Sequence, residues 1–222
     1  MKIITIVIII LIPSLLLADD ITFKLGGFIP DGKSDIWKVN TTETNFKVSN
    51  LAGFYAAAEV DLFLGKNFNF AVELGYSEKD TLTEDIDFVY PDDSPIEHTL
   101  FLRLVPLQGS FKFLPFGRDR KIIPYFGGGV GLYFWNYQEY GDFVINRYTE
   151  PEIITALFES SGADFGYHGM FGIMIPFGYH YTANAELKYA KVQGHLGSDF
   201  DPTFDPIDLS GLYATFGVSF WF

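Results

Sequence analysis

The sequence of 222 residues contains no cysteine. This absence excludes a disulfide-stapled scaffold, a catalytic thiol and a zinc site with cysteine ligands. Basic residues are also scarce, because 15 lysines and arginines stand against 28 acidic residues and give a formal charge of −13. A nucleic-acid-binding protein needs clustered lysine and arginine to neutralise phosphates. The charge balance therefore argues against a nucleic-acid partner.

Long apolar runs are missing except at the N-terminus, which reads MKIITIVIIILIPSLLLADD. Lys2 gives a positive start, residues 3–17 are predominantly apolar, and the small Ala18 precedes an acidic pair. The run is shorter than the roughly 20 residues of a spanning helix. It predicts a signal peptide over residues 1–18, cleaved after Ala18, with an uncleaved anchor as the alternative. Residues 19–222 then form one exported domain with 14 basic and 28 acidic residues.

Elsewhere apolar side chains alternate with polar or small ones, most strictly in LYATFGVSFWF at residues 212–222. A period of two is that of a β-strand, whereas a helix would spread both classes around its surface. The same alternation, bounded by turn residues, recurs along the chain. The predicted strands are 21–29, 53–64, 68–77, 98–113, 122–136, 164–177, 181–192 and 211–222.

The links between these strands alternate in length. The long links are 30–52, 78–97, 137–163 and 193–210, and the short links are 65–67, 114–121 and 178–180. Antiparallel outer-membrane barrels have an even number of strands, short periplasmic turns and longer external loops. The sequence therefore predicts an all-β fold, an eight-stranded antiparallel transmembrane β-barrel with short periplasmic turns and long extracellular loops.

One face of the predicted strands is apolar and the other carries the charges. The predicted lipid face includes Phe23, Leu25, Phe54, Leu74, Leu100, Leu102, Leu104, Phe126, Phe171 and Leu187. The predicted interior charge network comprises Lys24, Glu59, Asp61, Glu73, Arg103, Lys112, Glu186 and Lys188. Inward aromatic residues are expected at Tyr55, Phe63, Phe101, Tyr125, Tyr133 and Tyr213. Because an eight-stranded barrel is only wide enough for its own side chains, we expect a packed polar interior without a wide pore.

Two features of the predicted wall are irregular. In strand 98–113 the apolar phase changes at Val105–Pro106. A proline inside a closed barrel requires either a bulge or a missing ladder bond, and a bulge produces such a change of phase. The bulge is therefore the predicted solution. Gly127, Gly129 and Gly131 share the inward face of the next strand. They predict local curvature, with room for long side chains from across the barrel as the alternative.

Three stretches, VPLQGSFKF, IIPYFGGGVGLYFW and FGVSFWF, resemble the small eight-stranded outer-membrane β-barrel family of Gram-negative bacteria, which includes porin-like and opacity-type barrels. The resemblance implies location in the cell outer membrane, among its lipid and lipopolysaccharide. In that family the terminal alternating strand is recognised by the barrel-assembly machinery. Phe216, Val218, Phe220 and Phe222 match that assembly signal.

Catalytic and metal motifs are not apparent. The glycine-rich stretch does not fit a nucleotide-binding fingerprint, and only His168 among the four histidines is predicted to face inward. A lipid A-modifying enzyme would need histidine and serine near the outer rim, with Ser160, Ser161 and His168 as candidates. The acidic segments 78–97 and 197–211 lack the spacing of a calcium loop. No catalytic residue, cofactor or metal site is therefore predicted.

Three functions fit these observations. The preferred one is a non-enzymatic barrel with a structural or surface-interaction role, whose external loops carry specificity. The alternatives are a narrow channel for small or apolar solutes and a lipid A-modifying enzyme. A soluble lipid-binding barrel would reverse the two faces, with apolar side chains inside.

Overall fold

The computed structural model describes residues 18–200, 204 and 206–222. The predicted signal peptide, residues 1–18, lies outside this range except for Ala18, so its cleavage stays a prediction. In chain order the elements are β1 (Asp20–Pro30), α2 (Asp35–Glu43), η1 (Val48–Leu51), β2 (Gly53–Phe63), β3 (Phe68–Val89), β4 (Pro95–Phe113), β5 (Ile123–Ile145), β6 (Glu152–Phe177), β7 (Tyr181–Gly194), β8 (Ile207–Asp208) and β9 (Gly211–Trp221).

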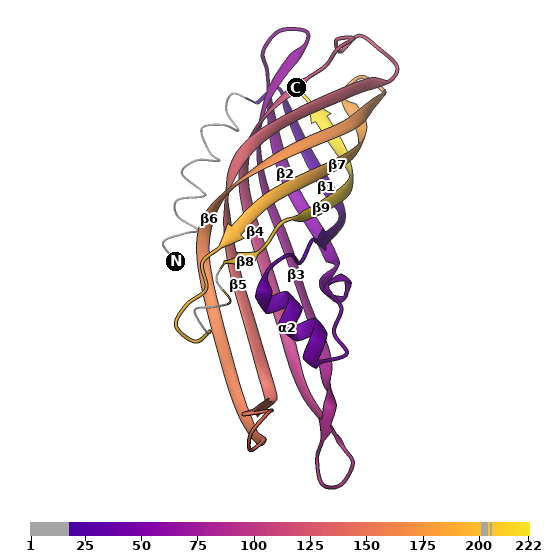
Figure 1. The fold of residues 1–222 in the computed structure, drawn as a ribbon. Coiled ribbons are helices and arrows are strands. Elements are labelled where there is room, and N and C mark those ends of the chain that lie inside the picture. The colour runs from indigo at the N-terminus through magenta and orange to yellow at the C-terminus, as the bar shows by residue number, and fades with distance from the viewer. Residues whose placement is uncertain (1–17, 201–203, 205) are drawn as a thin grey trace.

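Eight of these strands close into a ring of antiparallel neighbours. The last strand, β9, pairs with β1 from Asp20↔Trp221 to Pro30↔Gly211, and pairing of β6 with β7 completes the ring. The short β8 pairs with the far end of β7. Figure 1 shows the short turns and the C-terminus together at the top, which is the periplasmic end by the rule for such barrels. The predicted eight-stranded barrel is confirmed.

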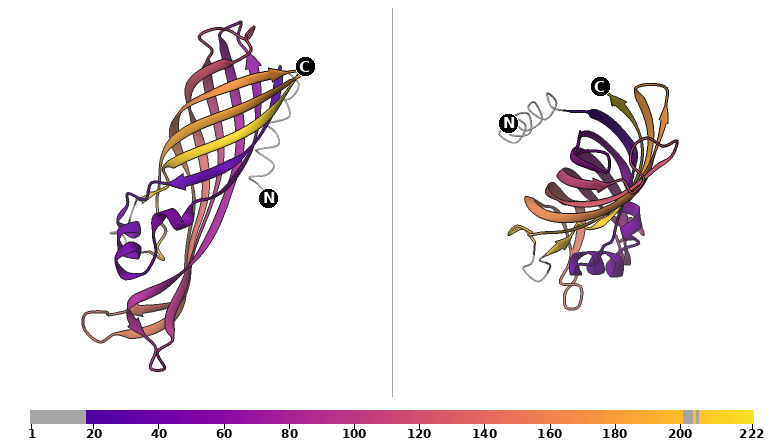
Figure 2. Two further views of the ribbon diagram at one scale, coloured as in Figure 1. Left: turned by 90° about the vertical axis from the view of Figure 1, so that its right-hand side faces the viewer. Right: turned by 90° about the horizontal axis from the view of Figure 1, so that it is seen from above.

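Four consecutive strands, β3 to β6, have 19 to 26 residues, whereas the other four strands of the ring have 11 to 14. A membrane strand needs about 9–11 residues. The long strands therefore continue beyond the membrane as two hairpins, with tips at 90–94 and 146–151 (Figure 2). The prediction of loops over 78–97 and 137–163 is wrong for most of their length, because antiparallel pairing continues through both segments.

The outer surface of the ring is apolar. Its exposed side chains include Phe23, Leu25, Phe54, Phe111, Phe126, Val130, Phe171, Leu187, Phe216 and Val218. At the periplasmic end, the ring centroids of Phe68 and Phe113 lie 5.0 Å apart, and those of Phe220 and Phe222 lie 5.2 Å apart. An apolar band edged by aromatic rings suits a lipid surrounding. Among the described residues, no helix has the length and apolar character needed to cross a membrane.

The predicted bulge at Val105–Pro106 is wrong. β4 keeps one register with β5 along its whole paired length. On its other side, the ladder with β3 has a gap between the pairs Leu74↔Leu107 and Ser77↔Leu104. Proline has no N–H to donate to a ladder. A missing ladder bond, rather than an extra residue, therefore accommodates the proline.

The extracellular half of β4 consequently presents faces opposite to those predicted. Leu100, Leu102 and Leu104 point inward and are buried, although they were expected to face lipid. Phe101 and Arg103 point outward, although they were expected inside. Both faces of the strand carry apolar residues in this stretch, so hydropathy alone does not give its phase. The inner leucines instead belong to an apolar layer inside the barrel.

Glycine is required where β5 approaches β4. A β-carbon at Gly129 would lie 2.0 Å from the carbonyl oxygen of Gly109, and one at Gly127 would lie 2.2 Å from that of Phe111. Both distances are far below van der Waals contact, so no larger residue fits without moving the backbone. The close approach of the two backbones therefore accounts for glycine at these two positions.

Candidate functional site

The membrane-level half of the barrel interior holds a network of buried ions. Lys24 lies at its centre, and its Nζ donates hydrogen bonds to carboxylate oxygens of Glu59 (2.9 Å), Glu73 (2.8 Å) and Glu186 (3.1 Å). These side chains come from β1, β2, β3 and β7. Each is at most 5% exposed. One ammonium group therefore connects four of the eight strands of the ring.

Two further lysines extend the network. Lys112 Nζ lies 2.6 Å from a carboxylate oxygen of Glu59 and 3.0 Å from one of Asp61, and Lys188 pairs with Glu73. Seven of the eight residues predicted for the interior charge network are thus brought together, as three lysines and four carboxylates. Buried ions are tolerated when they are paired and hydrogen-bonded. Every lysine of this network contacts at least two carboxylates.

Neutral donors complete the network. The hydroxyl of Tyr55 donates to Glu73 at 2.7 Å, and that of Tyr125 donates to Glu186 at 2.7 Å.

One buried carboxylate of the interior, that of Asp20, was not predicted from the sequence; Asp20 is 3% exposed. It stands one residue before the predicted first strand, on the alternate positions that face inward, so extending that strand by one residue would have found it.

The eighth predicted member, Arg103, does not belong to the network. Its side chain is 45% exposed on the outer surface, and its Nε donates to Glu78 at 2.7 Å. The hydroxyl of Tyr76 donates to the same carboxylate at 2.6 Å. These polar groups follow the apolar band at its extracellular edge, where water and lipid headgroups solvate them. Arg103 was assigned to the interior because the strand was expected to change phase.

Beyond the ions, toward the extracellular side, the interior becomes apolar. Its buried side chains include Phe28, Tyr55, Leu100, Leu102, Leu104, Tyr133, Trp135, Tyr137 and Tyr213. The helix α2 lies at this mouth of the barrel (Figure 1) and buries Ile36 and Trp37 against the same layer. The indole Nε1 of Trp37 donates to the carbonyl oxygen of Asp208 at 2.9 Å. The barrel interior is therefore capped at its extracellular end.

Sequence reasoning treated residues 30–52 as a loop and missed α2. Two signals were present. Ser34 occupies the N-cap position, and Ile36, Trp37 and Asn40 are spaced so that they share one buried face. A helix of nine residues is marginal in water by itself, so the packing of Trp37 into the barrel mouth is its main source of stability.

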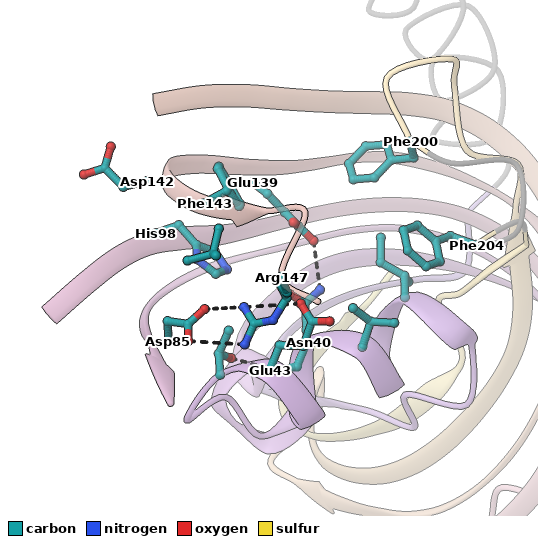
Figure 3. Close-up of a pocket in the computed structure, with 14 residues that line it drawn as sticks. Asn40, Glu43, Asp85, His98, Glu139, Asp142, Phe143, Arg147, Phe200 and Phe204 are labelled. Atoms are coloured by element: carbon teal, nitrogen blue, oxygen red, sulfur yellow. Dashed lines mark hydrogen bonds and ion pairs between the residues drawn. The ribbon is translucent and has the colours of Figure 1, made fainter. Parts of the chain in front are cut away.

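An extracellular pocket of about 100 Å³ lies between α2 and the inner faces of β3, β4 and β5 (Figure 3). Its polar lining consists of Asn40, Glu43, Thr44, Asp85, His98, Glu139, Asp142 and Arg147. Its apolar lining consists of Ile36, Val39, Phe143, Val144, Phe200 and Phe204. The pocket therefore joins an acid-rich surface to an aromatic one.

Arg147, at the tip of the β5–β6 hairpin, ties one side of the pocket together. Its guanidinium pairs with Asp85, with Asp87 at 3.1 Å and with Glu43 at 3.7 Å. Burial opposes ionisation of Asp85, but hydrogen bonds from Arg147 and from the backbone amides of Asp87 and Phe88 outweigh it. They hold the pKa of Asp85 below its usual value. The Arg147 guanidinium is thus already paired with acidic side chains of the same region.

Glu139 and His98 lie on the other side of the pocket. Glu139 Oε1 accepts hydrogen bonds from Asn40 Nδ2 at 2.8 Å and from the Tyr137 hydroxyl, and burial raises the pKa of Glu139. The ring of His98 stacks on Phe143, with 4.6 Å between the ring centroids, and its buried Nε2 has no hydrogen-bond partner among the described residues. Burial lowers the pKa of His98 to about 4, so this imidazole is uncharged at neutral pH.

The histidine and serines considered for lipid A chemistry are not brought together. His168 faces the barrel interior, where its Nε2 lies 2.8 Å from the Ser110 hydroxyl. Ser160 and Ser161 stand farther along β6, roughly 25 Å away at 3.3 Å per residue, and Ser160 Oγ accepts the Gly197 N–H. Within the part of the chain that the structure describes, no group of three or more potential ligands is arranged to hold a metal ion.

The ring, its apolar exterior and its ionic interior define a transmembrane β-barrel of eight strands. No family model matches the sequence, and no curated protein sequence matches it. Among solved structures, the chain is similar to a major outer membrane protein from Thermus thermophilus, with a TM-score of 0.56 and 11% identity, covering 91% of this chain and 99% of that chain.

Two further structures have the same architecture. The outer membrane protein OprG from Pseudomonas aeruginosa has a TM-score of 0.55 and 11% identity, over 92% of this chain and 96% of that chain. Neisserial surface protein A has a TM-score of 0.53 and 12% identity, over 91% of this chain and 96% of that chain. At these identities the likeness shows the fold, which is that of the small outer-membrane β-barrel proteins. The chain is an outer-membrane-type barrel.

Proposed function

We propose that this chain is a non-enzymatic outer-membrane protein whose closed barrel supports an extracellular platform for interaction at the cell surface. The observation that carries the proposal is the filled interior, with paired ions at membrane level and a capped apolar layer beyond them. An eight-stranded barrel has just enough internal space for its own side chains. A solute would have to displace both paired ions and packed aromatic rings.

The proposed platform consists of the four long strands, α2 and the pocket between them. Strands of 19 to 26 residues stand well clear of the lipid. The helix is held on them by Trp37 inside the barrel mouth and by Asn40, whose amide donates to Glu139. Binding residues are often carried on extensions of a rigid scaffold. This arrangement supports a surface-interaction role, with outer-membrane lipid and lipopolysaccharide around the barrel.

We also infer that the final strand guides assembly through the barrel-assembly machinery. Phe216, Val218, Phe220 and Phe222 form one exposed outward row. Replacing Phe222 with alanine should lower the yield of folded barrel in the outer membrane, measured by heat-modifiable gel mobility. The matched control is Tyr148→Ala, which removes an exposed aromatic ring from an extracellular tip. Equal yields for the two variants would count against an assembly role.

Electrical recording tests the closed barrel against the narrow-channel alternative. The purified protein in a planar bilayer should give no stable openings, because the interior is occupied at both levels. Steady openings with ohmic current would contradict the proposal and favour a channel.

Two experiments on cells test the surface placement of the hairpin tips and the proposal that the protein is not a lipid A-modifying enzyme. External protease should cut the tips 90–94 and 146–151 in intact cells, and cleavage only after lysis would refute their surface placement. Lipid A from expressing cells should keep its mass. A change of mass that disappears in His168→Ala would instead indicate a lipid A-modifying enzyme.

A further inference from the structure

Some charged side chains of the extracellular pocket have a partner of opposite charge among the described residues, and others do not. Arg147 is the one cationic side chain among the described residues that line it, and its guanidinium serves Asp85, Asp87 and Glu43. Asp142 accepts hydrogen bonds from two neutral hydroxyl groups at the outer edge of the pocket. No cation of the lining is therefore left for the remaining carboxylate, that of Glu139.

Glu139 and His98 both line this pocket (Figure 3), and each has an acceptor atom that receives no hydrogen bond from a described residue. Only Oε1 of Glu139 accepts hydrogen bonds from described residues, and its donors, Asn40 and Tyr137, are neutral. The Nε2 of His98 is buried and has no hydrogen-bond partner in the part of the chain that the structure describes. His98 pairs with Gly141 on β5, so it is a diagonal neighbour of Glu139 on the inner face, within about 7–8 Å.

The rest of the pocket lining is apolar. Phe143, Phe200 and Phe204 supply aromatic rings, and Ile36 and Val39 supply aliphatic groups from α2. The cavity of about 100 Å³ exceeds the space of a single water several times. It has room for a group of a few carbon and nitrogen atoms. An aromatic wall beside a carboxylate favours a cation that also carries hydrocarbon.

We propose that this pocket binds a primary alkylammonium group, with Glu139 as its counter-ion and His98 Nε2 as a second acceptor. The ammonium supplies N–H donors for both acceptors, and its methylene groups pack on the phenylalanine rings. The chain's formal charge of −13 attracts cations to this site. The inference rests on the proposed function only in placing the pocket on the extracellular side.

The test is a titration of the purified full barrel in detergent micelles with propylammonium chloride, followed by the ring ¹⁵N shifts of His98. Saturable binding is expected, with roughly tenfold weaker binding in Glu139→Gln. The matched control is Glu159→Gln, which removes the same charge from the outer face of β6, opposite Gln138. The affinity of Glu159→Gln for propylammonium should differ from that of the wild type by less than about twofold. Tetramethylammonium, which has no N–H donor, and neutral propanol should bind far more weakly.

A second variant covers the case in which Glu139→Gln does not fold. His98→Phe keeps a flat ring to stack on Phe143 but removes Nε2, and methyl shifts of Ile36 then report binding; roughly fivefold weaker affinity is expected. Unchanged affinity in the folded variants, no saturation in the wild type, or equal binding of propanol would overturn the inference. A barrel that is electrically closed but takes up no propylammonium would refute the pocket and leave the proposed function standing. Open channels would refute the proposed function instead.

Discussion

The two halves of the barrel interior are filled with opposite chemistry. At membrane level, three lysines bridge four carboxylates, whereas the extracellular half packs Trp37, leucines and tyrosines. The surroundings are opposite as well, because hydrocarbon lies around the ionic half and water around the apolar half. In each half, the groups that the surroundings of that half would not solvate therefore lie on the inside of the barrel.

This contrast follows from the cost of exposure. An ionised side chain turned toward the bilayer midplane would cost about 2–4 kcal/mol, so the charges of the membrane-level half collect inside and pair. Beyond the lipid, acidic residues of the hairpins can face water. Apolar side chains then gain about 25 cal/mol for each Å² that they bury inside. The inner surface consequently changes from ionic to apolar along the same strands.

The largest expected effect comes from breaking the ionic half at its centre. Lys24→Met leaves Glu59, Glu73 and Glu186 without their shared ammonium group, and removing one partner of a buried ion pair costs about 3–5 kcal/mol. Denaturant unfolding in micelles measures the loss. The control is Arg103→Met, which breaks an exposed pair on the outer surface and should cost less than about 1 kcal/mol. Equal losses would mean that the interior pairs are as hydrated as the exterior one.

A slightly smaller effect is expected from the apolar half. Trp37→Ala removes a fully buried ring and should cost about 3 kcal/mol. The loss should appear as faster hydrogen exchange of the α2 amides, while exchange in the membrane-level strands stays unchanged. Lys38→Ala, on the exposed face of the same helix, is the control and should leave exchange almost unaltered. Faster exchange throughout the ring would show that the two halves unfold as one unit.

Acidification should loosen the extracellular half. His98 has a pKa lowered from 6.5 to about 4 by burial, despite the nearby Asp85 carboxylate. The unfolded segment therefore binds more protons than the folded one between these values, and stability falls as pH drops from 6.5 toward 4. The shift corresponds to at most roughly 3 kcal/mol.

The contribution of His98 is isolated by comparison with a variant that does not titrate. In His98→Phe, protection of the α2 amides should lose this part of its pH dependence, although Glu139 and Asp85 still titrate nearby. An identical pH profile in the two proteins would show that His98 is not buried uncharged in this pocket.

The smallest effect is expected at the hairpin tip. Arg147→Gln removes hydrogen bonds to Asp85 and Asp87, which are worth about 1.5 kcal/mol when one partner is charged. Proteolysis at the tip 146–151 should become faster, while global unfolding changes little. Arg120→Gln, in a periplasmic turn, is the control. A large global loss in Arg147→Gln would show that the tip and the barrel are energetically coupled.

The sequence allowed the ring and most of its interior charges to be predicted, because lipid imposes a strict alternation on membrane strands. Lys24, Glu59 and Glu186 could be assigned inward since no outward position would tolerate them. The same reasoning failed for Leu102 and Arg103. There the strand leaves the lipid and both of its faces carry apolar residues. Continuing the alternation of inward and outward residues from the periplasmic half of β4, without a bulge, would have placed Leu102 inside and Arg103 outside.

The pocket could not be predicted from the sequence. Its lining joins α2 to side chains from β3, β4 and β5 that are more than 40 residues distant in the chain. His98 belongs to the inner face only in the corrected phase of β4, and Glu139 lies in a segment that resembled a loop. Only the extension of the pairing beyond the membrane brings the two side chains together.

Proton exchange at the three interior ammonium groups tests the closed interior most directly. In ¹⁵N-lysine-labelled barrel at neutral pH, the side-chain NH₃⁺ signals of Lys24, Lys112 and Lys188 should persist, because each group is hydrogen-bonded to carboxylates and is at most 3% exposed. The signal of the exposed Lys38 should be broadened by exchange with water and serves as the reference. Exchange of the interior groups as fast as that of Lys38 would reveal a water column through the barrel and contradict the account.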